Sequence, residues 1–123
     1  MDVVIVDYGM GNLYSIESAF KYLGVQACLS ANPQKILNAD RIVLPGVGSF
    51  HKAMMNLNSN GLVEAIKEAV LDRNIPILGI CLGMQILGIS CTEGGFNKGL
   101  NFVKYQVKKF HIGDTRLKIP HVG

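Results

Sequence analysis

The sequence has 123 residues, of which 49% are hydrophobic and 17% charged, and its formal net charge is +3. This apolar content can build a core, which excludes a chain disordered throughout, and the length suits one domain. The basic residues are scattered and Lys108–Lys109 is the only basic pair. Nucleic-acid binding requires a dense basic stripe, so we predict no nucleic-acid partner.

The cysteines and the longest uncharged segment restrict the class of protein further. Cys28, Cys81 and Cys91 stand at no C-x-x-C spacing, which excludes zinc ribbons and thioredoxin-type motifs. The chain opens without a basic leader, so we expect a reducing cytoplasm. The uncharged segment Ile75–Cys91 contains one proline and three glycines, which favours a buried strand and helix over a membrane span.

Strand and helix patterns alternate along the chain. Short β-branched runs predict strands, and apolar residues at spacings of three and four predict helices. In chain order we expect a strand at Val3–Val6, a helix at Leu13–Leu23, a strand at Val25–Leu29, a helix at Pro33–Leu37, a strand at Arg41–Leu44, a helix at Gly61–Asn74, a central strand at Ile77–Ile80 and a helix at Leu82–Ile89. The fold class is therefore α/β, with a mostly parallel sheet and helices on both faces.

The end of the sequence changes pattern. Residues from Tyr105 to Phe110 alternate in polarity, which predicts an antiparallel hairpin or edge strand with Leu117–Ile119 as its partner. No helical pattern follows to cover these strands. We therefore expect residues 1–123 to be the front part of a longer domain.

The five residues Gly79–Gly83 carry the main chemical signal. They fit the pattern G-x-nucleophile-x-G, with a strand before and a helix after. Such a turn strains the backbone of the nucleophile and lifts its side chain above the sheet. The start of a helix favours thiolate over thiol, and the N–H of Leu82 would point where an oxyanion forms. Cys81 is therefore predicted to be a nucleophile, whereas Cys28 and Cys91 are expected to fill the core.

Two glycine-bearing loops lie at the carboxyl ends of predicted strands. The loop Pro45–Gly48 would lie at the same sheet edge as Cys81 and could supply a second oxyanion N–H, or it could be an ordinary turn. The loop Gly9–Tyr14 fails as a dinucleotide motif because Tyr14 stands where glycine or alanine is needed. We predict no cofactor and no metal.

The sequence shows no evident general base. Attack of a thiolate on an amide needs a proton for the leaving ammonia, which a histidine oriented by a carboxylate normally supplies. The histidines are His51, His111 and His121, and none belongs to an H-x-E or H-x-D motif. We expect His51 to be a surface or capping residue.

Four motifs resemble one protein family in their order and spacing. They are Asp7-Tyr8-Gly9-Met10-Gly11-Asn12, Pro45-Gly46-Val47-Gly48, Gly79-Ile80-Cys81-Leu82-Gly83-Met84-Gln85 and Pro120-His121-Val122-Gly123. The chain resembles the glutaminase subunits of imidazole glycerol phosphate synthase, which are class I glutamine amidotransferases of histidine biosynthesis. All 123 residues align with the front part of this family.

The resemblance implies a flavodoxin-like fold and a set of roles. A glutaminase of this kind hydrolyses glutamine and passes ammonia to a (β/α)₈ cyclase subunit in a cytoplasmic heterodimer. The cyclase would form imidazole glycerol phosphate and an aminoimidazole carboxamide ribotide. The implied residues are Cys81 as nucleophile, Gly48 and Leu82 as oxyanion donors, Gln85, Gly46 and Val47 at the substrate, and Asn12 and His121 near the partner.

The sequence departs from the family in one respect. The family's catalytic His and Glu form an H-x-E motif near the end of a longer chain, and these residues stop before it. We therefore expect little or no glutamine turnover from the 123 residues alone. Three alternatives stay open: a glutaminase partner of a sugar amidotransferase in surface-polysaccharide synthesis, a non-catalytic docking remnant, and a flavodoxin-like module binding flavin or phosphate.

Overall fold

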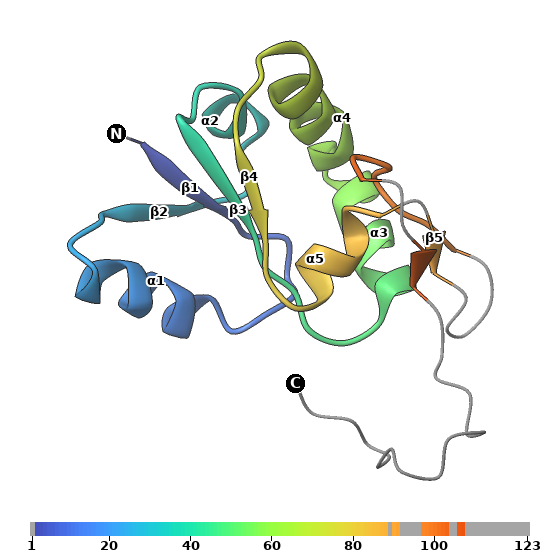
Figure 1. Cartoon of the computed structure of the whole chain (residues 1–123), viewed down its shortest axis with the longest axis horizontal. Helices are drawn as coiled ribbons and strands as arrows, with labels where there is room; N and C mark the ends of the chain where they lie inside the picture. The colour runs from blue at the N-terminus through green and yellow to red at the C-terminus, as the bar shows by residue number, and fades with distance from the viewer. Residues whose placement is uncertain (1, 89, 92–96, 104–105, 108–123) are drawn as a thin grey trace, which may run out of the picture.

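A computed structural model of the chain describes residues 2–88, 90–91, 97–103 and 106–107 (Figure 1). His111, His121 and the predicted strand Leu117–Ile119 lie outside these ranges. Among the described residues, no helix has the length and apolar character needed to cross a membrane.

The main sheet has four strands, and all of its pairings are parallel. The strands are β1 (Val3–Val6), β2 (Ala27–Ser30), β3 (Arg41–Leu44) and β4 (Ile77–Gly79), in the spatial order β2-β1-β3-β4. This arrangement confirms the predicted parallel sheet. The order also places the first strand of the chain inside the sheet, so loops from β1, β3 and β4 leave it side by side at one end.

Helices cover both faces of this sheet, as predicted. Helix α1 (Leu13–Tyr22) packs on the face that carries Val3, Ile5 and Val43. The opposite face carries the larger core, and Figure 1 shows α1 lying apart from the helices of that side. These helices are α2 (Pro33–Leu37), α3 (Phe50–Ser59), α4 (Leu62–Lys67) with its π-helical continuation η1 (Glu68–Asp72), and α5 (Leu82–Ile86).

The structure differs from the sequence-based expectation at three elements. Helix α3 had no predicted range, although Ser49 caps it and Phe50, Ala53 and Leu57 form its buried stripe. The helix predicted at Gly61–Asn74 is α-helical only in its first part. The strand expected to be central, β4, is the outer strand of the described sheet, and Leu78 is 54% exposed there.

A second, smaller sheet follows α5. It consists of β5 (Ser90–Cys91), β6 (Asn97–Lys98) and β7 (Gln106–Val107), in the order β6-β5-β7. β5 pairs antiparallel with β6 but parallel with β7. The described part of the predicted antiparallel hairpin, β7, therefore pairs in parallel with Ser90–Cys91.

Candidate active site

Cys81 stands in a strained backbone conformation between β4 and α5. Its φ is 55° and its ψ is −119°, which is far from the left-handed helical region. Among the described residues, positive φ outside glycine occurs only at Asn74, Cys81 and Asn101. Asparagine tolerates positive φ, but cysteine has no such preference. The strain expected from the G-x-nucleophile-x-G pattern is therefore present, and strain of this kind gathers at functional sites.

The glycines that flank the turn are required by close packing. A Cβ added to Gly83 would lie 1.8 Å from the carbonyl oxygen of Leu44, and one added to Gly79 would lie 2.7 Å from Cα of Met84. Both are distances that real Cβ atoms do not adopt because the neighbouring backbone cannot yield cheaply. The elbow therefore rests directly on the end of β3, and only glycine permits this contact.

Cys81 is exposed to solvent and does not fill the core. The amides that follow it are less available. Leu82 N–H donates to the carbonyl oxygen of Gly46 at 3.1 Å, and Gly83 N–H donates to Ile80 at 2.9 Å. An oxyanion that used Leu82 N–H would thus have to replace the carbonyl of Gly46. Since α5 has only five residues, we assign its dipole a minor part in activating the sulfur.

The loop Pro45–Gly48 lies against the elbow. Ile80 N–H donates to the carbonyl of Leu44 at 3.0 Å, so the bond from Leu82 to Gly46 continues the β3–β4 ladder past the ends of both strands. Further along the loop, Val47 and Gly48 are exposed, and within the described residues their N–H groups donate to no acceptor. Gly48 has a φ of 98°, which a residue with a side chain rarely adopts. These two amides are therefore available as donors in the loop that adjoins the elbow.

The other residues predicted for the site lie on different elements and differ in their burial. Gln85 is half-buried on α5, one turn after Cys81. Asn12 caps α1, because its Oδ1 accepts the N–H of Ser15 at 3.3 Å. His51 is exposed in the first turn of α3, where Ser49 and not His51 acts as the cap. His121 lies outside the described residues.

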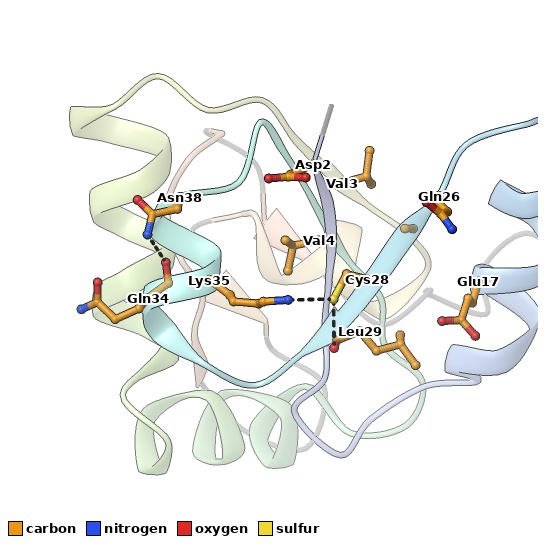
Figure 2. Close-up of a pocket in the computed structure, with 11 residues that line it drawn as sticks. Asp2, Val3, Val4, Glu17, Gln26, Cys28, Leu29, Gln34, Lys35 and Asn38 are labelled. Atoms are coloured by element: carbon orange, nitrogen blue, oxygen red, sulfur yellow. Dashed lines mark hydrogen bonds between the residues drawn. The ribbon is translucent and has the colours of Figure 1, made fainter.

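Cys28 is not a core residue, which corrects the expectation for this cysteine. It is exposed on the outer strand β2, where its sulfur accepts a hydrogen bond from Nζ of Lys35 at 3.3 Å (Figure 2). A cavity of about 790 Å³ opens beside it, between β2, α1 and α2, and its lining includes no residue of the elbow. The side chain of Cys91 lies outside the described atoms.

The described part of the chain holds no cluster of metal-ligating side chains. No group of three or more His, Cys, Asp or Glu side chains there could hold a metal ion. The chemistry that the elbow itself offers is nucleophilic attack by the thiol of an exposed cysteine. The adjoining loop carries backbone amides that could stabilise a developing negative charge.

The sequence matches one protein family, and curated proteins are similar to it along most of its length. The family described as glutamine amidotransferase class-I matches residues 4–121. The imidazole glycerol phosphate synthase subunit HisH 1 of Parasynechococcus marenigrum is 49% identical, over 98% of this chain and 58% of the relative. The protein of the same name from Campylobacter jejuni is 47% identical, over 98% of this chain and 60% of the relative. The chain thus spans about three fifths of the length of these curated relatives.

A solved structure supports the fold alone. A crystal structure described as a glutamine amidotransferase superposes with a TM-score of 0.73 at 17% sequence identity, covering 90% of this chain and 58% of that one. At this level of identity the likeness concerns the backbone and not the chemistry of the site.

Proposed function

This chain belongs to the class I glutamine amidotransferase family, and from that premise we propose that Cys81 is the nucleophile of a glutaminase. The single observation that supports this most strongly is the strained, exposed turn at Cys81, since no packing requirement explains a cysteine there. The close fit of Gly79 and Gly83 against the neighbouring backbone explains how the strain is held.

The proposed reaction begins with attack of the Cys81 sulfur on the side-chain amide carbon of glutamine. The S–C bond forms while the carbonyl electrons move to oxygen, and the oxyanion is stabilised by backbone N–H groups of the loop Pro45–Gly48. The C–N bond then breaks, and ammonia leaves after gaining a proton. Water hydrolyses the thioester, which releases glutamate and restores the thiol.

The residues around the sulfur have proposed supporting roles. Gly48, whose N–H is free in the described structure, is the first oxyanion donor. Leu82 becomes the second when the carbonyl of Gly46 moves away from it. Gln85, one turn along α5, contacts the substrate together with Gly46 and Val47.

The names of the relatives suggest the wider setting. We propose that the chain acts as the glutaminase part of an imidazole glycerol phosphate synthase, in the cytoplasm, as a heterodimer with a (β/α)₈ cyclase subunit that receives the ammonia. Asn12 and His121 would lie near that partner. The sequence contains no H-x-E motif, so we expect the 123 residues to form the thioester but to turn over little glutamine by themselves.

The test separates the nucleophile from the missing proton donor. The p-nitrophenyl γ-ester of glutamate needs no protonated leaving group, because the phenolate departs as an anion. We expect a stoichiometric burst of phenolate and a γ-glutamyl adduct on Cys81, found by peptide mass spectrometry. Cys81→Ala should abolish the burst, and the matched variant Cys28→Ser should keep it. A burst that survives Cys81→Ala would refute the proposal.

A further inference from the structure

Tyr8 places a buried hydroxyl group against the loop Pro45–Gly48. The residue is 3% exposed, and its hydroxyl donates to the carbonyl oxygen of Pro45 at 2.5 Å. Burial raises the pKa of this phenol above its usual value, so the hydroxyl stays protonated as a donor at ordinary pH. A buried hydroxyl needs a partner, and here the partner is the first carbonyl of the loop Pro45–Gly48.

The backbone of Tyr8 is held by a second hydrogen bond. Nδ2 of Asn56, on α3, donates to the backbone carbonyl of Tyr8 at 3.1 Å. Helix α3 begins at Phe50, directly after the loop and its cap Ser49. The loop therefore lies between the end of β3 and the start of α3. Tyr8 links the Pro45 end of the loop to the second half of α3, through its hydroxyl and its carbonyl.

The bond to Pro45 sets the direction of the next amide. A trans peptide is planar, so its C=O and N–H groups point in opposite directions. Holding the Pro45 carbonyl toward Tyr8 therefore holds the N–H of Gly46 away from it. A Cβ on Gly46 would lie 2.5 Å from the Tyr8 oxygen and 3.1 Å from Cβ of Leu82, so this glycine is enclosed between the phenol and the elbow.

A further hydrogen bond joins the loop to the residue that follows Cys81. Gly46 receives Leu82 N–H through its carbonyl, and Leu82 follows Cys81 in the chain. Figure 1 shows the loops after β1 and β3 and the start of α5 at one end of the sheet. A shift of the Pro45 carbonyl would turn the peptides of the loop, and with them the free amides of Val47 and Gly48.

We propose that Tyr8 is a positioning residue, which orients the loop Pro45–Gly48 so that its amides can receive the oxyanion formed at Cys81. The inference rests on the proposed glutaminase function and deepens it. Tyr8 does not touch the substrate, and it acts only through the carbonyl of Pro45. Its contribution should therefore appear in reactions that pass through an oxyanion and not in those that do not.

Two reagents for the same sulfur provide the test on the full chain with Tyr8→Phe. The p-nitrophenyl γ-ester of glutamate passes through an oxyanion, whereas iodoacetamide alkylates the sulfur by direct displacement. Removing a direct oxyanion donor costs about 10²–10³-fold, so a residue that acts through the loop should cost roughly tenfold with the ester. With iodoacetamide we expect a change within about twofold, since no oxyanion forms.

The matched control is Tyr22→Phe, because Tyr22 is 91% exposed on α1 and its loss should alter neither rate. Equal slowing with both reagents, or no slowing with the ester, would overturn the role of Tyr8. If Tyr8→Phe does not fold, as judged by circular dichroism, Asn56→Ala provides a second test with the same two reagents. Freeing the Tyr8 carbonyl loosens the backbone that positions the hydroxyl on Pro45, so we expect a smaller slowing that is again confined to the ester. If the unaltered chain shows no ester burst at Cys81, the proposed function itself fails, which is a distinct result.

Discussion

Cys28 and Cys81 are both exposed cysteines, but their backbone conformations differ. Cys28 lies in the regular strand β2, and its sulfur accepts one hydrogen bond from a surface lysine. Cys81 occupies a strained turn, where two glycines in close contact with neighbouring backbone hold it in place. Exposure therefore does not distinguish the candidate nucleophile. The distinguishing feature is the unfavourable free energy of the backbone conformation at Cys81.

The largest expected effect comes from breaking the elbow with Gly83→Ala. A methyl group in the middle of a helix normally stabilises it by about 1 kcal/mol relative to glycine. Here the Cβ would lie 1.8 Å from the Leu44 carbonyl, so we expect the free energy of unfolding to fall by about 3 kcal/mol or more. Urea denaturation followed by circular dichroism measures the change.

A suitable control for this variant is Gly24→Ala. Gly24 has a φ of 79°, but a Cβ there meets no atom within 4 Å. Only the conformational penalty applies, so we expect a loss of about 1 kcal/mol. If Gly83→Ala costs no more than Gly24→Ala, the close contact between the elbow and β3 does not hold the strain.

The next effect concerns helix α2, whose Lys35 contacts Cys28. Oδ1 of Asn32 accepts the N–H of Gln34 at 2.9 Å and so caps α2, the helix that carries Lys35. Asn32→Ala should lower the free energy of unfolding by about 1 kcal/mol, the usual cost of losing an asparagine cap. Urea denaturation measures the loss, and iodoacetamide modification of Cys81 should keep its rate. A slower reaction at Cys81 would mean that the two regions are not independent.

The smallest effect is electrostatic and is confined to Cys28. Lys35→Met removes the ammonium 3.3 Å from the sulfur, so an anionic aromatic disulfide reagent should react with Cys28 about two- to fivefold more slowly at low salt. Peptide mass spectrometry resolves the two cysteines. The difference should shrink at high ionic strength, because salt screens exposed charges. An equal slowing at Cys81 would contradict the local nature of this contact.

Much of the fold followed from local patterns in the sequence. The bounds of β1, α2 and β3 agree with prediction because β-branched runs and the Asn32-Pro33 start are local signals. The extent of helix α3 was not predicted because Asn56, Asn58 and Ser59 weaken its helical propensity, although Ser49 and the buried stripe were visible signals. The exposure of Cys28 depends on the order of strands in the sheet, which periodicity along one strand does not reveal.

The candidate site was predictable only in part. The G-x-nucleophile-x-G pattern is local, so it indicated the strain at Cys81 before the structure did. The contact between Tyr8 and Pro45 joins residues 37 positions apart, and no short motif encodes it. The hydrogen bond from Leu82 N–H to Gly46 was likewise not predictable from the sequence, because it depends on how far the β3–β4 ladder continues beyond the strands.

The central claim, that the Cys81 turn forms a glutamine-recognising nucleophile, is tested most directly by competitive labelling. The unaltered chain is treated with a chloroketone analogue of glutamine, and peptide mass spectrometry follows Cys28 and Cys81 with and without L-glutamine. We predict that Cys81 is labelled first and is protected by L-glutamine, while Cys28 reacts slowly and without protection. Equal labelling of the two cysteines, or labelling of Cys81 that L-glutamine does not slow, would contradict the account.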